Sequence, residues 1–194
     1  NRADRITPMP ADESPLRAEH GLDGKFIVMY SGNAGLIHTF DAVCEAMRRL
    51  RDDRRIVFLF VGGGKRLSEI AGYAAEHELA NFVRLPYFPR ERLNESLAMG
   101  DAHLITLRPE MAGVAVPCKT YGIMAAGRPA IFVGPADADT ARHLRDAEAG
   151  IIIAPDNPGA LVDAIRRLAD DEGYRRRLGA NARSAFEQRH ERIV

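Results

Sequence analysis

Short apolar segments alternate with longer amphipathic segments along almost the whole chain, and this alternation limits the folds that the chain can adopt. Ile56–Val61 is apolar throughout, which is typical of a strand whose two faces are both covered. Thr39–Leu50 instead carries its apolar residues at the three- and four-residue spacing of a helix. Strands that alternate with helices of this length predict an α/β fold with a parallel sheet, in which right-handed crossovers place helices on both faces.

The same patterns predict the bounds of each element. Six strands are expected, at Phe26–Tyr30, Ile56–Val61, Phe82–Leu85, Ala102–Thr106, Ala130–Val133 and Ile151–Ile153. Helices are expected at Thr39–Leu50, Lys65–Glu78, Arg90–Met99, Lys119–Ala126, Asp139–Ala147, Asn157–Asp170 and about Asp171–Gln188. Ligands of such sheets bind at the carboxyl ends of the strands. The functional side chains are therefore expected in the loops that follow the strands.

The composition excludes several classes of protein. Lysine plus arginine and aspartate plus glutamate are equal, at 27 each among 194 residues, so no overall field attracts nucleic acid. No apolar run is long enough to span a bilayer, and the two cysteines do not suggest a disulfide framework. We therefore expect a cytoplasmic protein.

The first residues of the chain are rich in proline and charge, and they begin at Asn1 rather than at methionine. We expect residues 1–24 to be a linker from a missing N-terminal domain. Residues 25–194 are long enough to bury a full core, so we expect them to form one domain.

The segment from Val116 to Pro129 carries the clearest functional pattern. It places Lys119 at the start of a short helix, which a Gly-Arg-Pro turn joins to the strand Ala130–Val133. The first turn of a helix has unpaired backbone N–H groups and the positive end of the helix dipole, so it attracts phosphate. A lysine there adds a full charge, and we expect it to be solvated beside a cleft. The alternative is a loop with one surface lysine that closes an ordinary strand–helix–strand unit.

Two glycine-rich turns follow the first and second expected strands. Ser31–Gly35 has two glycines that let a ligand approach the backbone, but it lacks the third glycine of a dinucleotide-binding fingerprint. Gly62–Lys65 resembles a P-loop, but Leu59 replaces its first glycine and Arg66 replaces the serine or threonine that binds magnesium. A Walker-type ATPase is therefore not expected, and plain strand-to-helix turns are the alternative to a ligand site.

Other candidate chemistry is sparse. No two of the six histidines stand at a zinc-binding spacing, and no nucleophile elbow is present. His38 opens the first expected helix and is a candidate substrate contact, with a structural histidine as the alternative. Asp137 and Asp139 are a candidate metal pair, with a solvated loop as the alternative. The arginines of the last helix could rest on anionic lipid or form a solvated face with the acidic residues between them.

Taken in order, these segments resemble the C-terminal, nucleotide-binding domain of family four glycosyltransferases with the GT-B fold, also called group 1 glycosyltransferases. The resemblance covers nearly the whole chain, through the segments Tyr30–Asn33, Phe60–Gly64, Val83–Tyr87, Pro117–Pro129, Gly150–Asp156 and Leu178–Arg183. It implies a Rossmann-like domain that forms the C-terminal half of a GT-B fold. It also implies a retaining transfer of sugar from a UDP-, GDP- or ADP-linked donor to a polysaccharide or lipid-linked acceptor, without a metal or other cofactor.

The resemblance further implies that an N-terminal acceptor domain of the same protein is the partner, so this chain alone should be inactive. Peripheral contact with the cytoplasmic membrane face would follow from a lipid-linked acceptor. Lys119 is implied as the catalytic residue, because a positive charge there would stabilise the leaving diphosphate. The nucleotide base of the donor would lie against the backbone near Leu85–Tyr87. The candidate donor-binding residues are Gly32, Asn33, Gly35, His38, Gly63, Gly64, Lys65, Leu85, Pro86, Tyr87, Pro117, Thr120 and Tyr121.

The sequence departs from the family pattern at one pair of positions. The family carries two glutamates, the second of which holds the ribose, and Val114 and Gly122 stand at those positions here. Glu110 lies nearby but out of register, and Tyr121 could supply a different donor grip. A binding or assembly module without catalysis, and a GT-B-type sugar-nucleotide epimerase, therefore stay open as alternatives.

Overall fold

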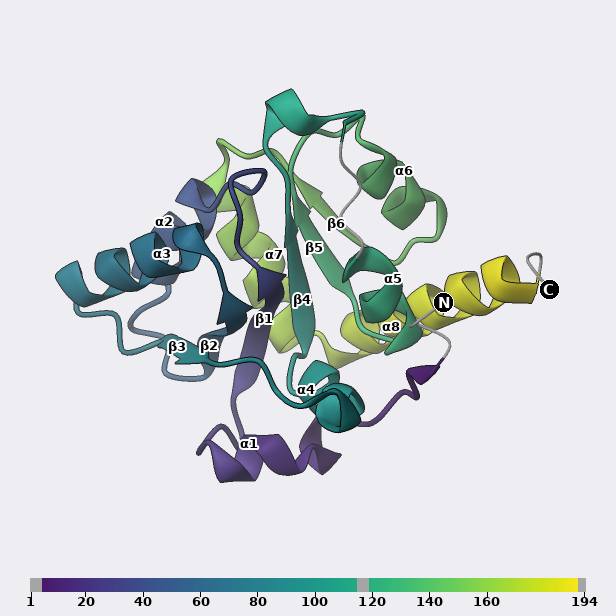
Figure 1. Cartoon of the computed structure of the whole chain (residues 1–194), viewed down its shortest axis with the longest axis horizontal. Helices are drawn as coiled ribbons and strands as arrows, with labels where there is room; N and C mark the ends of the chain where they lie inside the picture. The colour runs from purple at the N-terminus through teal and green to yellow at the C-terminus, as the bar shows by residue number, and fades with distance from the viewer. Residues whose placement is uncertain (1–4, 115–118, 192–194) are drawn as a thin grey trace.

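The computed structural model describes residues 5–114 and 119–191, and it shows a six-stranded sheet with helices on both faces (Figure 1). Every strand pairing is parallel, and the strand order is β3-β2-β1-β4-β5-β6. The strands are β1 Phe26–Asn33, β2 Ile56–Gly63, β3 Phe82–Leu85, β4 Ala102–Thr106, β5 Ala130–Val133 and β6 Gly150–Ile153. The predicted fold class is therefore confirmed.

Apart from the helix at Pro15–Glu19, which was not predicted, the helices also follow the predicted order. They are α1 Pro15–Glu19, α2 Asp41–Arg49, α3 Lys65–Glu76, α4 Leu93–Ala98, α5 Lys119–Ala125, α6 Asp139–Asp146, α7 Pro158–Asp170 and α8 Glu172–Glu191. Three 3-10 turns accompany them, η2 Ala11–Glu13, η3 Arg90–Arg92 and η4 Pro109–Met111. The helix expected from Arg90 thus begins as a 3-10 turn. Of the helices described, none is both long and apolar enough to cross a bilayer.

The side chains of β1 alternate between two apolar layers, one on each face of the sheet. Val28 and Tyr30 point into the layer beneath α2, α3 and α7. Ile27 and Met29 point into the opposite layer, where the buried Leu16 of α1 packs. Further along that opposite face, α5, α6 and α8 pack against β4 and β5. Because both faces of the sheet are covered at its centre, β2 and β5 are buried and apolar along nearly their whole length rather than at every second residue.

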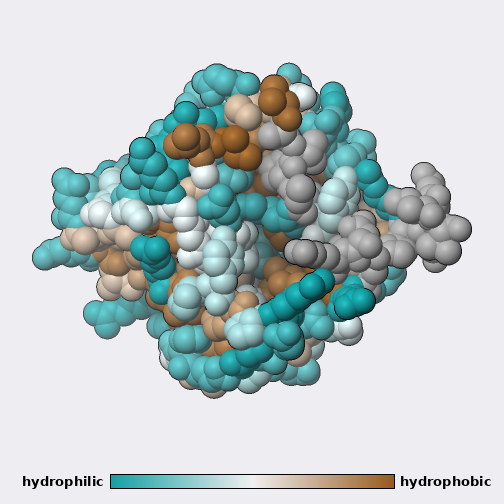
Figure 2. All heavy atoms as spheres, viewed as in Figure 1, coloured by the Kyte–Doolittle hydropathy of each residue, from teal (hydrophilic) through white to brown (hydrophobic). Residues whose placement is uncertain are grey.

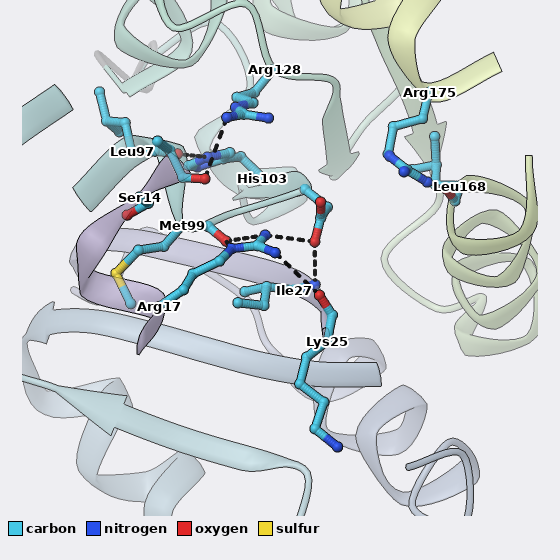
Figure 3. A network of polar contacts seen from close by, with 12 residues as sticks. Ser14, Arg17, Lys25, Ile27, Leu97, Met99, His103, Arg128, Leu168 and Arg175 are labelled. Atoms are coloured by element: carbon cyan, nitrogen blue, oxygen red, sulfur yellow. Dashed lines mark hydrogen bonds and ion pairs between the residues drawn. The ribbon is translucent and has the colours of Figure 1, made fainter. Parts of the chain in front are cut away.

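A buried polar network joins α1 to the amino-terminal edge of the sheet (Figure 3). The Arg17 guanidinium donates to the Met99 carbonyl at 2.6 Å and to the Asp101 carboxylate at 2.7 Å. The same carboxylate oxygen accepts the backbone N–H of Ile27 at 2.8 Å. The two charged side chains are only 6% and 11% exposed. Residues 15–19, which lie within the segment expected to be a linker, are therefore held against the sheet. The expected domain boundary at residue 24 stays a prediction.

The strand order reverses between β1 and β4. The chain passes outward from β1 to β3 on one side of this point, and outward from β4 to β6 on the other. In open sheets of this kind, the ligand crevice lies at the carboxyl ends of the strands beside such a reversal. Gly32, near the carboxyl end of β1, and Lys119, in the first helix after β4, meet there: the Lys119 Nζ lies 3.7 Å from the position that a Cβ on Gly32 would take. The predicted gathering of these loops at one edge is confirmed.

Candidate functional site

Two glycine turns pack directly against each other at the carboxyl ends of β1 and β2. The backbone N–H of Ala34 donates to the Gly63 carbonyl at 2.7 Å, and the Arg66 N–H donates to the Ala34 carbonyl at 3.0 Å. Gly64 has a φ of +112°, and a Cβ atom there would lie 2.5 Å from the Asn33 side-chain oxygen. Glycine is required at position 64 because both the backbone conformation and the lack of space exclude a side chain.

Tyr87 lies against the second glycine turn, from the loop that follows β3. A Cβ atom on Gly62 would lie 3.0 Å from the Tyr87 ring and would collide with the Gly32 carbonyl oxygen. Tyr87 is nonetheless 59% exposed. An exposed aromatic ring beside a bare backbone turn can stack on a planar group such as a nucleotide base.

Lys119 reaches this edge of the sheet from α5, and its environment corrects the sequence prediction. Its Nζ lies 3.5 Å from the centroid of the Tyr30 ring. Nζ is shielded from solvent and has no hydrogen-bond partner among the described residues, although the residue as a whole is partly exposed. Burial lowers the pKa of the Lys119 amine from its ordinary 10.5 to about 7. The expectation of a solvated lysine is therefore wrong.

The described part of the chain supplies no counter-charge to the Lys119 amine. Burial alone accounts for its lowered pKa, whereas a nearby carboxylate would raise that pKa. Burial also raises the pKa of the Tyr30 phenol, so this neighbour is neutral at pH 7. His38 is neutral too, because burial and the nearby Lys119 charge lower its pKa to about 4. Among the described residues, the site thus holds a desolvated amine without an anion beside it, and a negatively charged ligand would complete the pair.

His38 connects the loop after β1 to the end of β4. Its Nδ1 lies 2.7 Å from the Thr106 carbonyl oxygen, which can only accept a hydrogen bond, so Nδ1 carries the proton. The imidazole is buried, and its Nε2 keeps a lone pair. These contacts give His38 a structural role across the strand reversal, and its role as a substrate contact stays a prediction.

Most of the predicted donor-binding residues lie in the loops at this edge of the sheet. Lys65, the first residue of α3, is exposed beside the glycine turns. The predicted residues at the carboxyl ends of β1, β2 and β3, or in the segments that directly follow these strands, are Gly32, Asn33, Gly35, His38, Gly63, Gly64, Lys65, Leu85, Pro86 and Tyr87. Their contact with a donor stays a prediction.

The remaining predicted residues belong to α5 and the segment before it. Thr120 is buried. Tyr121 packs beside Phe186 of α8, and the Arg189 guanidinium lies 4.9 Å from its ring centroid. Because residues two apart lie on opposite sides of a helix, Tyr121 and Lys119 point in different directions, and the structure does not bring Tyr121 to the glycine turns. Pro117 lies outside the described residues.

Exposed apolar side chains surround this edge of the sheet. Leu36 is 64% exposed in the loop after β1, and Val114 is 75% exposed in the loop after β4. Figure 2 shows hydrophobic residues over these upper loops. Val114 occupies the first of the two glutamate positions, so this edge presents an apolar side chain where the family pattern has a carboxylate.

Several of the side chains considered for metal or lipid binding have partners within the chain. Within residues 5–114 and 119–191, no group of three or more histidine, cysteine, aspartate or glutamate side chains could hold a metal ion. Asp139 forms an ion pair with Arg142. In α8, Arg175 donates to the Leu168 carbonyl and Arg183 donates to the Ala125 carbonyl, each at 2.6 Å. These α8 arginines therefore have structural contacts of their own.

The family model described as "Glycosyl transferases group 1" matches residues 12–185 of the chain. The chain belongs to the group 1 glycosyltransferases. It is 28% identical over 192 residues to the "Probable glycosyltransferase WbjE" of Pseudomonas aeruginosa. It is 32% identical over 160 residues to the "Putative colanic acid biosynthesis glycosyl transferase WcaI" of Escherichia coli. These matches cover 97% and 81% of this chain, so this glycosyltransferase family accounts for nearly all of its sequence.

This group 1 glycosyltransferase chain also shares its fold with solved glycosyltransferase structures. HepE from Anabaena, crystallised in complex with UDP-glucose, superposes with a TM-score of 0.80 at 16% identity. The superposition covers 96% of this chain and 50% of that chain. The chain spans 46% and 39% of the length of the two curated relatives. It therefore corresponds to about half of a glycosyltransferase, or less.

Two further residues of this candidate site, Tyr30 and Thr106, were not among the predicted site residues, although Tyr30 begins one of the segments that resemble the family. Both belong to strands that the apolar pattern identifies, and that pattern says nothing about ligands. The Tyr30 ring lies beneath the Lys119 amine, and the Thr106 carbonyl oxygen accepts the hydrogen bond from His38. The signal that could find them is their position, because each lies at the carboxyl end of a strand on either side of the reversal.

Proposed function

We propose that this chain is the donor-binding domain of a retaining glycosyltransferase that transfers sugar from a nucleotide sugar to a polysaccharide or lipid-linked acceptor. The observation that carries the proposal is the desolvated Lys119 amine beside Gly32, which has no hydrogen-bond partner among the described residues. Membership of the group 1 glycosyltransferases and the UDP-glucose complex of HepE support a nucleotide diphosphate as the missing anion. The name of WcaI, which refers to colanic acid biosynthesis, supports a polysaccharide acceptor.

In this proposal the donor diphosphate lies along the glycine turns with the Lys119 amine beside it. The nucleotide base of the donor extends toward the exposed ring of Tyr87. When the bond between the anomeric carbon and the diphosphate oxygen breaks, negative charge grows on that oxygen. A charged Lys119 would stabilise the growing charge more strongly in a desolvated site than in water. The amine then supplies the positive charge that a metal ion supplies in other transferases.

The acceptor is assigned to a second domain, because this chain spans less than half of its curated relatives. This chain should accordingly bind a donor without transferring its sugar. A cytoplasmic location and peripheral contact with the membrane face are part of the same proposal, since a lipid-linked acceptor would be met there.

One observation favours a second candidate function, a sugar-nucleotide-binding module without catalysis. Val114 and Gly122 replace the two glutamates of the family pattern, and Val114 is a largely exposed apolar residue in the loop after β4. An epimerase would need acidic and histidine catalytic residues, and the Nδ1 of His38 already donates a hydrogen bond to the Thr106 carbonyl oxygen. The module is therefore the alternative that the experiment has to separate from the enzyme.

Two measurements test the proposal. First, the melting temperature of this chain should rise with millimolar UDP, GDP or ADP, because a ligand that binds only the folded state stabilises it. Uridine without phosphate is the control, and no shift with any of the three nucleotides would contradict a nucleotide site. Second, the full-length protein is assayed with UDP-, GDP- and ADP-sugars. Sugar transfer or donor hydrolysis supports the enzyme, and binding without either supports the module.

A further inference from the structure

We propose that Tyr30 is a positioning residue for donor binding, whose ring holds the Lys119 amine beside the Gly32 backbone before the donor arrives. The inference rests on the proposed function, because it concerns how the same site is prepared for its diphosphate. It assigns to Tyr30 a role that the family resemblance, although it includes the segment Tyr30–Asn33, does not imply.

The first step is the contact between the amine and the ring. The Lys119 Nζ lies 3.5 Å above the Tyr30 ring centroid, well within the range at which an aromatic face attracts a cation. The face of an aromatic ring carries partial negative charge, and the attraction grows when water is excluded, as it is here. Since no hydrogen-bond partner of Nζ is described, the ring is the described group that attracts the charged amine.

The second step is the rigidity of the ring. Tyr30 is fully buried, and Phe40 packs against it edge-on with ring centroids 5.0 Å apart. Phe60 lies on another side, with centroids 5.9 Å apart. The phenol donates to the Asn33 carbonyl oxygen at 3.1 Å, so the ring is also tied to the glycine turn. The ring therefore has one orientation, and it presents a fixed face to the amine.

The third step is the consequence for binding. A lysine side chain has four rotatable bonds and loses much of its conformational freedom when a ligand orders it. A side chain that is already held in the binding position does not lose that freedom on binding, so affinity increases. Because the amine rests between the Tyr30 ring and the Gly32 backbone, the ring performs this ordering in advance.

The ring and the hydroxyl of Tyr30 can be separated by substitution. Tyr30→Phe keeps the ring and removes the hydrogen bond to Asn33. Tyr30→Met removes the ring and keeps most of the volume. We expect Tyr30→Phe to bind UDP within about twofold of wild type, and Tyr30→Met to bind it about three- to tenfold more weakly, at pH 6.5. In the Lys119→Met background, Tyr30→Met should have no further effect, because the group it acts through is gone.

Calorimetric titration of UDP into the four members of this cycle measures the coupling, after thermal melts show that each variant folds. A loss on Tyr30→Met that is equally large with and without Lys119 would overturn the inference, because it would be a general effect on the fold. Tighter binding by Tyr30→Met would also overturn it, because the ring would then hold the amine away from the ligand.

Phenylalanines with increasing fluorine substitution at position 30 keep the shape of the ring and weaken its attraction for a cation. They replace Tyr30→Met if that variant does not fold. Affinity for UDP should fall stepwise with fluorination, and the Lys119 amine pKa, followed by NMR in the ligand-free chain, should fall with it. An amine pKa that does not respond would contradict the ring contact. If wild type binds no nucleotide while the amine pKa does respond, the proposed function fails and the ring contact stands, so the two failures are distinguishable.

Discussion

Donor binding is expected to weaken as the pH rises from 6 to 9, because the Lys119 amine loses its proton within that range. The pKa of this amine in the ligand-free chain is about 7. A diphosphate beside the amine favours the charged form and raises that pKa. Binding above pH 7 therefore takes up a proton, and the affinity falls as protons become scarce.

The size of the effect follows from the fraction of charged amine. A group with this pKa is about 90% charged at pH 6 and about 1% charged at pH 9, so the affinity would fall about 100-fold if only the charged form bound. The fall in affinity is limited because the chain with a neutral Lys119 amine still binds the donor, only without the contribution of the charge. A hydrogen bond to a charged group contributes about 1.5–3 kcal/mol, which corresponds to about 10- to 150-fold in affinity. We expect a fall of about 10- to 100-fold between pH 6 and pH 9.

The assay is calorimetric titration of this chain with a nucleotide sugar at several pH values. A nucleotide sugar is chosen because its diphosphate is esterified at both ends, whereas a terminal phosphate changes charge near pH 6. His38, with a pKa of about 4, and Tyr30, with a raised pKa, keep one protonation state throughout this range. Lys119→Met should bind weakly with little pH dependence. Lys119→Arg should also show little pH dependence, because a guanidinium stays charged.

An affinity that is equal at pH 6 and pH 9 would refute the reasoning, as would a pH dependence that survives Lys119→Met. Stability supplies an independent check. Between pH 7 and 10.5 the unfolded chain carries a proton on Lys119 that the folded chain has lost, so the free energy of unfolding should rise with pH through this group. Below pH 7 the cost of the buried charge is fully present, and Lys119→Met should gain stability there relative to wild type.

Two further substitutions test the structure around the site. Asp101→Ala should lower the free energy of unfolding, measured by urea denaturation, by about 3–5 kcal/mol, because it leaves the buried Arg17 charge unpaired. Asp52→Ala, at an exposed position, should change that free energy by less than about 0.5 kcal/mol. Equal effects would contradict the buried network. Gly64→Ala should lower both the melting temperature and the donor affinity, because φ is +112° and two oxygen atoms lie within 2.6 Å of the position that the Cβ would take. Gly72→Ala in α3, where nothing lies within 4 Å of that position, should be neutral or stabilising. A neutral Gly64→Ala would show that the turn is not constrained.

Local patterns are sufficient to predict most of the fold. The strands β3, β4 and β5 have the bounds expected from sequence. A strand buried on both faces, such as β5, must be apolar throughout, whereas the partly exposed edge strand β3 includes Arg84 and ends before Pro86. The strands β1 and β2 extend beyond their apolar runs, because Gly32 and Gly62 continue the ladder through backbone pairing alone. The helix α1 was outside the reach of such patterns. Its burial depends on Arg17 and Asp101, which lie 84 residues apart.

The sequence by itself determined the layered fold and the glycine turns, because apolar periodicity and glycine placement are local properties of a chain, and it marked Lys119 as a candidate. Only the tertiary structure decided that the Lys119 amine is desolvated, lacks a described partner and lies on the Tyr30 ring. The two residues are far apart in the sequence and belong to different elements. The charge state of a side chain depends on everything that encloses it, and that enclosure exists only once β1 and α5 have been brought together.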